Sequence, residues 1–242
     1  MSRCHIDRVR RSTVTLLAAM TIVVLTGCAS TAPAGAPAAR PAGKSAKTEA
    51  VAETRALPAA KDRARVQVDG GLGFTVTEVV HIGSDVRSDY QQAVAMLRQE
   101  RLGEGIALLE RVVERAPGLT APHVDLGVAY GRNAQWDKAE QSLQAALALT
   151  PDHPAALNEI GIVYRRIGKF DAARSSYERA LRVHPTYHYA LRNLGVLCDL
   201  YLEDFPCALD AYRRYVELVP DDAQVGLWIA DLSARMGVAT KE

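Results

Sequence analysis

The chain has 242 residues, and its 29 basic and 28 acidic side chains leave a formal net charge of +1. So balanced a charge does not favour nucleic acid or an anionic lipid surface as a partner. The length is sufficient for one domain of ordinary size preceded by a signal and a linker.

The first 27 residues combine a basic start with an apolar run of about fourteen residues that ends at Leu25. A transmembrane helix needs about 20 apolar residues, so we interpret this segment as a secretory signal. The signal ends in the stretch LTGC, which closes with Cys28 and resembles the lipobox of bacterial lipoproteins. The resemblance implies cleavage before Cys28 and acylation of this cysteine with lipid. The alternative is an ordinary signal cut near Ala29.

A protein that carries several acyl chains stays durably on a membrane. The resemblance also implies that Ala29, the residue after the lipidated cysteine, directs a Gram-negative lipoprotein to the outer membrane, facing the periplasm. In a Gram-positive source the anchor would be the cell membrane, with the protein on its outer side. We therefore predict an exported protein held by its amino terminus.

Two segments with different compositions follow the cysteine. Residues 28–64 contain mostly Ala, Pro, Lys, Thr and Gly, so they lack the apolar surface needed to offset the entropy of ordering, and we expect a disordered tether. Residues 65–84 alternate apolar and polar side chains around a Gly-Gly turn, which predicts a short β-hairpin. Because a lone hairpin is marginal in water, it should pack on the helical body or pair with another chain's strand.

The remainder has helical periodicity and a regular series of prolines, at Pro117, Pro151, Pro185 and Pro220. Their spacing of 34 or 35 residues indicates a repeat architecture. Aligned on these prolines, the third copy resembles the tetratricopeptide repeat in the size of its side chains. The matching positions are Leu157, Ile160, Gly161, Tyr164, Ala173, Tyr177, Ala180 and Pro185.

The resemblance implies an all-α solenoid of about four helix-turn-helix repeats. Their predicted bounds are 86–119, 120–153, 154–187 and 188–222. An exposed apolar end requires a cap, and residues 223–236 have the periodicity of a capping helix. Trp228 in this helix should anchor the cap, the alternative being a residue that stacks on a ligand.

Two cysteines remain in the exported part, Cys198 and Cys207. They fall on the two helices of the last repeat, where an antiparallel hairpin would place them opposite each other. Export to an oxidising compartment permits a disulfide, whereas the alternative is a pair of small buried thiols.

The sequence contains no recognisable set of catalytic residues or phosphate-binding loop, so we expect neither an enzyme nor a cofactor. His184 and His188 have a metal-like spacing, but Pro185 interrupts the helical face that a metal-binding pair would share. We therefore expect no metal site. His153 and His184, beside the prolines, should cap helices or face solvent.

In tetratricopeptide proteins the first helices of successive repeats line a groove that binds a peptide or helix of a partner. The resemblance assigns this groove to Tyr90, Val94, Val124, Val128, Asn158, Ile162, Arg165, Tyr189, Arg192 and Asn193. Arg165 and Arg192 would favour carboxylates. The alternative is a solvated face with no specific ligand.

These inferences together predict a membrane-anchored scaffold that binds a protein or peptide partner in a bacterial envelope assembly. The second hypothesis is a ligand-sensing or catalytic accessory domain, with its site between residues 65–84 and the repeats.

Overall fold

The computed structural model of the chain describes residues 64–68, 71–78 and 80–237. The predicted signal, Cys28 and the tether as far as residue 63 lie outside the described residues. Among the residues that the structure does describe, no helix is long and apolar enough to cross a membrane.

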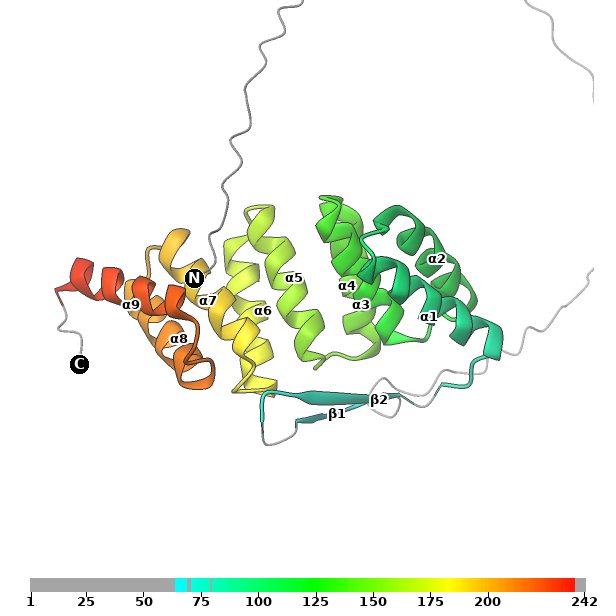
Figure 1. The fold of residues 1–242 in the computed structure, drawn as a ribbon, viewed down its shortest axis with the longest axis horizontal. Coiled ribbons are helices and arrows are strands. Elements are labelled where there is room, and N and C mark those ends of the chain that lie inside the picture. Colours follow the sequence, from blue (N-terminus) through cyan, green and yellow to red (C-terminus); the bar gives the residue numbers. More distant parts are fainter. Residues whose placement is uncertain (1–63, 69–70, 79, 238–242) are drawn as a thin grey trace, which may run out of the picture. The chain divides into compact units, whose positions relative to one another are not determined.

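The described residues form two strands followed by a series of antiparallel helix pairs (Figure 1). The elements are β1 (Ala64–Val68), β2 (Phe74–Glu78), α1 (Ser84–Arg98), α2 (Leu102–Arg115), α3 (Thr120–Arg132), α4 (Trp136–Leu149), α5 (Pro154–Arg166), α6 (Phe170–Val183), α7 (His188–Leu200), α8 (Phe205–Leu218) and α9 (Ala223–Met236). Each pair packs on the next, and α9 packs on α8. The predicted all-α solenoid is confirmed.

The second helix of each pair stops before a proline of the 34-residue series. Helix α6 ends at Val183, and the next residue, His184, leaves the helical conformation with φ −135° and ψ 88°. The ring of Pro185 disfavours the helical conformation at the residue before it, which explains the stop. Helices α2, α4 and α8 end in the same way.

The two helices of a repeat approach closely because a glycine of the first helix faces a large side chain of the second. These contacts join Gly127 to Leu143, Gly161 to Tyr177 and Gly195 to Tyr212. A Cβ atom at Gly161 would lie 2.5 Å from Cε1 of Tyr177, a ring that is wholly buried. The helix crossing therefore has no room for a side chain at this position.

The turns inside the repeats reuse one backbone conformation. Glu100, Ala134, Gly168 and Glu203 all have φ between 52° and 78°. This left-handed conformation suits glycine and is strained for other residues. Only the third repeat has glycine there.

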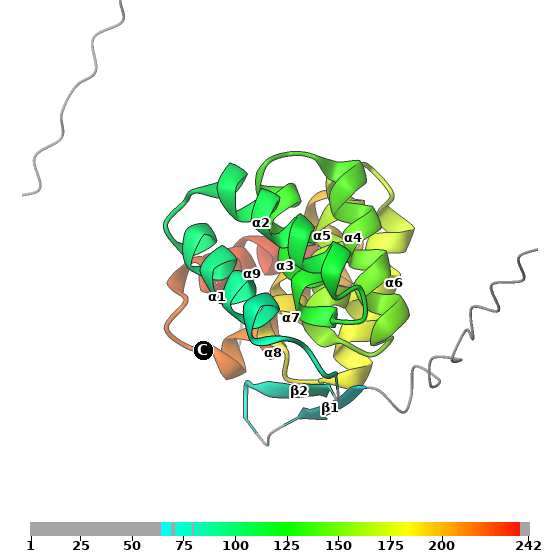
Figure 2. The ribbon, with the colours of Figure 1, turned by 90° about the vertical axis from the view of Figure 1, so that its right-hand side faces the viewer.

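Strands β1 and β2 pair antiparallel, with Val66 opposite Val76. The hairpin lies along one edge of the helix stack in both Figure 1 and Figure 2. Of the two arrangements expected for it, the structure has the packing against the helical body. Helix α1 begins at Ser84, two residues before the predicted start of the first repeat at residue 86. Asp85 in the first turn favours this earlier start.

Cys198 of α7 and Cys207 of α8 form a disulfide in the structure, with their Cα atoms 5.9 Å apart. The bond joins the two helices of the last repeat across a turn of irregular chain. Of the two alternatives for these cysteines, the structure has the disulfide.

Candidate functional site

Three cavities lie along the first helices of the repeats. The first, of about 560 Å³, is lined by α1 and the residue that follows it; the second, of about 450 Å³, lies between α3 and α5. The third, of about 580 Å³, involves α5, α7, α8 and α9. The predicted groove is thus divided into separate compartments, which we call the first, middle and last cavities.

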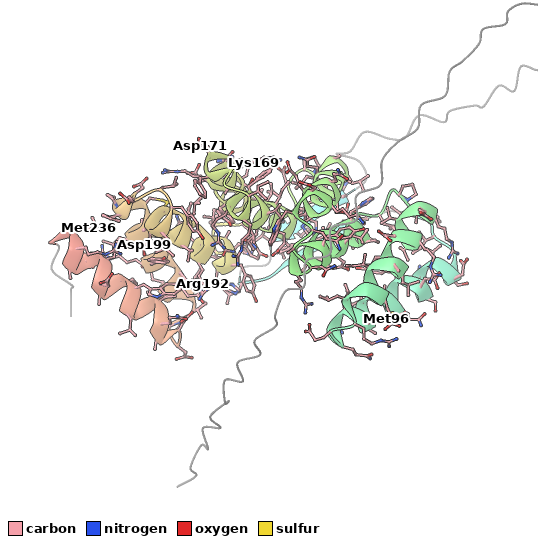
Figure 3. All side chains as sticks on the ribbon, turned by 90° about the horizontal axis from the view of Figure 1, so that it is seen from above. Met96, Lys169, Asp171, Arg192, Asp199 and Met236 are labelled. Carbon is pink, nitrogen blue, oxygen red and sulfur yellow. A yellow bond between two sulfur atoms is a disulfide. The ribbon has the colours of Figure 1, made fainter. Side chains whose placement is uncertain are left out.

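The last cavity combines aromatic and charged side chains. Its lining is Arg165, Arg192, Asn193, Val196, Asp199, Leu200, Tyr212, Trp228, Asp231 and Arg235. Arg192 and Asp199 lie two turns apart on α7, and Figure 3 labels both. Arg235 of α9 pairs with Asp199 at 2.8 Å and with Asp231 at 3.0 Å. Carboxylates therefore already neutralise this arginine.

Two other arginines of the last cavity are less well paired. The Arg192 guanidinium lies 5.0 Å from the centre of the Trp228 ring, and its Nε is 3.8 Å from Asp222. Arg165 lies 5.6 Å from the Tyr201 ring, and its Nε is buried with no hydrogen-bond partner among the described residues. Aromatic rings hold both guanidinium groups while leaving them able to pair with an incoming carboxylate.

Arg165 also acts on the interior of the repeat. Burial raises the pKa of Tyr177 to about 12, and the nearby Arg165 charge opposes that rise. The tyrosine stays neutral at physiological pH and cannot serve as a counter-ion to the arginine.

The middle cavity is mainly apolar. Val128 and Ile162 line it together with Trp136 and two glycines, Gly127 and Gly131. Near its wall, Glu159 accepts a hydrogen bond from Asn158 at 3.0 Å, and burial raises the pKa of its carboxyl. The cavity can accommodate an apolar side chain beside a partly desolvated carboxylate.

The first cavity is lined by Tyr90 and Val94 among others. The Tyr90 hydroxyl donates to Asp125 of α3 at 2.7 Å. Burial, with the Asp125 charge, raises the pKa of Tyr90, so the hydroxyl remains a donor. Burial also raises the pKa of Asp125. The bond ties the first repeat to the second.

Two predicted groove residues are not accessible. Val124 is only 9% exposed and packs in the core shared by the first three repeats. Asn158 is 2% exposed, and its Oδ1 accepts a hydrogen bond from Asn193 Nδ2 at 2.9 Å. Their helix faces turn toward the neighbouring helices, so these two assignments were wrong. Tyr189 is exposed at the start of α7, beside Tyr187, and does not line the three cavities.

Trp136 and Glu159 line the middle cavity, although no sequence pattern indicated them as site residues. Trp136 lies at the start of a second helix, outside the helices that the resemblance assigns to the groove. Trp228 packs on Tyr212 with ring centres 5.4 Å apart, as a cap anchor should, and it also lines the last cavity.

The junction histidines are buried. Nδ1 of His153 accepts a hydrogen bond from the Ala156 amide at 3.2 Å, which is a capping contact. Burial lowers the pKa of His153 to about 4. His184 is fully buried and does not face solvent, because the hairpin covers it.

The Phe74 ring of β2 lies between the hairpin and the repeats, where the second hypothesis placed a ligand or catalytic site. It contacts His153, His184 and Tyr187 edge to face, with ring centres 5.7 to 6.1 Å apart. The Phe74 ring thus occupies the position between the hairpin and the repeats where that hypothesis placed the site.

One group of potential metal ligands lies close together among the described residues: Cys198, Asp204 and Cys207. The sulfur atoms are joined in the disulfide, so neither is a thiolate, and Asp204 pairs with Arg174 at 2.9 Å. The group has no ligand atoms to spare in this state.

Comparison with known protein families supports the repeat assignment for part of the chain. Tetratricopeptide-repeat family models match residues 118–186 and 159–223. No curated protein matches the sequence significantly.

Several solved structures share the fold at low sequence identity. MamA (residues 41 to the end) from Desulfovibrio magneticus RS-1 is 19% identical with a TM-score of 0.59, and the match covers 65% of this chain and 88% of that one. MamA from strain AMB-1 is 24% identical with a TM-score of 0.54, covering 63% and 83%. Pseudomonas aeruginosa PilF is 19% identical with a TM-score of 0.57, covering 62% and 68%.

Proposed function

Because the helical body is a stack of tetratricopeptide repeats, we propose that this protein is a membrane-anchored scaffold that binds a segment of a partner protein along its first helices. The observation that carries the proposal is the last cavity, where Arg165 and Arg192 stack on aromatic rings. Among the described residues, Arg165 has no carboxylate partner and Arg192 has only the 3.8 Å contact of its Nε with Asp222. An acidic side chain or chain terminus of a partner would complete their pairing.

The middle cavity supports a second contact with the same segment. Ile162 and Arg165 are three residues apart on α5, so their side chains lie about one turn apart and open into neighbouring cavities. A segment that crosses α5 would bury an apolar side chain against Ile162 and place a carboxylate near Arg165.

The proposed location is a bacterial cell envelope, with Cys28 carrying the lipid and the repeats on the periplasmic side of the outer membrane. The support for it is the LTGC stretch after the apolar signal. Labelling of living cells with a radioactive fatty acid tests the anchor, because the label should appear in the full chain and be absent from Cys28→Ser. Equal labelling of both chains would contradict the anchor.

Site-specific photo-crosslinking tests the scaffold. A crosslinking amino acid at Val128 or Asn193, on the first helices, should capture the same partner in intact cells. The matched control carries it at Arg213, which is exposed on the second helix α8. Capture from Arg213 alone would place the binding surface elsewhere. Arg165→Glu should reduce capture from Asn193 while leaving the helical circular dichroism unchanged.

A further inference from the structure

The hairpin β1–β2 spans three repeats at their junctions. Thr120, at the start of α3, donates its amide to the Glu78 carboxylate at 3.1 Å. Phe74 touches the start of α5, the end of α6 and the start of α7 through His153, His184 and Tyr187. Thr186 donates to the carbonyl of Gly71 at 3.1 Å. One short strand and its turn therefore hold together elements that are far apart in the sequence.

Alternate residues of the hairpin make this contact. Phe74, Val76 and Glu78 are partly buried, whereas Thr75 and Thr77 are exposed. The strand has one face on the repeats and one in solvent, so the hairpin can leave without breaking a helix.

Each of the two imidazoles against Phe74 has one ring nitrogen that is not placed to donate a hydrogen bond. Nε2 of His184 is buried with no hydrogen-bond partner among the described residues, and Nδ1 of His153 accepts a hydrogen bond. A protonated imidazole has an N–H at both nitrogens. Nδ1 of His184 contacts the Thr186 hydroxyl at 3.3 Å, so protonation would place at Nε2 a buried N–H without a partner in the described part of the chain, and it would break the accepting bond at His153.

We propose that the hairpin is a strap that docks across the repeat junctions at neutral pH and is released when the two imidazoles against Phe74 are protonated. This inference does not depend on the proposed partner or on the lipid anchor. The proposed change is the reversible docking and release of the hairpin at the edge of the repeat stack.

The surrounding ionisable groups do not compensate for such a charge. Burial lowers the pKa of His153 to about 4; a backbone hydrogen bond opposes this effect in part, and no carboxylate of the described residues does so. On the α6–α7 side, His188 also has a pKa lowered by burial and by His184. Glu159 acts on Tyr187, and Glu78 of β2 is engaged with Thr120.

The direction of the pH effect follows from these values. A histidine whose pKa is lowered in the docked state stabilises docking above its ordinary pKa of 6.5, and this contribution is lost as the pH falls toward 4. If His153 returns to its ordinary pKa on release, the equilibrium between docked and released hairpin would shift toward release by roughly 20-fold between pH 7 and pH 5.

A nitroxide spin label at Thr75, on the solvent face of β2, measures release directly. The full chain would carry Thr75→Cys with Cys4→Ser and Cys28→Ser. The label should be ordered at pH 7.5 and become mobile at pH 4.5, while circular dichroism at 222 nm shows the helices intact. An unchanged spectrum over this range would overturn the proposal.

Three variants separate the imidazoles from other acid-sensitive groups. The double variant His153→Asn/His184→Asn, which cannot be protonated, should keep the label ordered at pH 4.5 with Glu78 still present. The control His123→Asn alters a histidine of similar exposure that does not touch Phe74, and it should release as the parent does. Phe74→Ala should be mobile at both pH values, which shows that the label senses docking. Release of the double variant equal to that of the parent would refute the role of these histidines.

Discussion

Replacing single glycines by alanine tests the close helix crossing. In the interior of a helix, Gly→Ala contributes about 1 kcal/mol of stability because alanine loses less backbone entropy on folding. At Gly131, the penultimate residue of α3, the added Cβ would meet only Trp136, at 3.9 Å, so part of this contribution is available. At Gly161 the same atom would lie 2.5 Å from the buried Tyr177 ring.

Relieving the clash at Gly161 means moving the Tyr177 ring, which is wholly buried. Overpacking of this kind costs about 1 to 3 kcal/mol, which exceeds the gain in helix propensity. We therefore expect Gly161→Ala to lower the free energy of unfolding by about 1 kcal/mol, and Gly131→Ala to raise it by up to about 1 kcal/mol.

Urea denaturation followed by circular dichroism measures both variants against the parent chain. A difference of about 2 kcal/mol between them corresponds to roughly 4 to 8 °C in melting temperature for a domain of this size. The crossing geometry would be refuted if Gly161→Ala proved at least as stable as Gly131→Ala.

Three further changes test other contacts of the fold. Ala134→Gly should raise the free energy of unfolding by about 1 kcal/mol, since φ at this residue is 54°, and urea denaturation should show no increase if the strain is absent. The double variant Cys198→Ala/Cys207→Ala should have a free energy of unfolding about 2 to 3 kcal/mol lower than that of the parent. A urea midpoint equal to that of the oxidised parent would show that the disulfide contributes nothing to stability. Tyr90→Phe should lower the free energy of unfolding by about 1 to 3 kcal/mol, because Asp125 loses its hydrogen-bond donor. Thermal melts should show a lower melting temperature, which adding Asp125→Asn should partly restore.

The regular features of the chain were predictable because each depends on local chemistry. A proline ends the helix before it whatever surrounds it, so the 34-residue spacing indicated where α2, α4, α6 and α8 stop. A glycine that faces a large side chain recurs at repeat spacing, as Gly161 faces Tyr177, and the complementary sizes indicated a close helix crossing.

The site was less predictable, because side-chain exposure depends on how the repeats rotate against one another. A position on a first helix can face the groove or the next helix after a small rotation, and Val124 and Asn158 turned out to face neighbouring helices. Trp136 reaches the middle cavity from a second helix, which no pattern on the first helices could indicate.

The sequence by itself determined the helix pairs, their period and the cap, since these follow from proline stops, glycine crossings and apolar periodicity within short stretches of chain. Only the tertiary structure decided how the groove divides into cavities, which arginines are incompletely paired with carboxylates, and where the hairpin docks. Those properties arise from contacts between residues 20 to more than 100 positions apart, such as Gly71 with Thr186, and packing rather than local preference selects them.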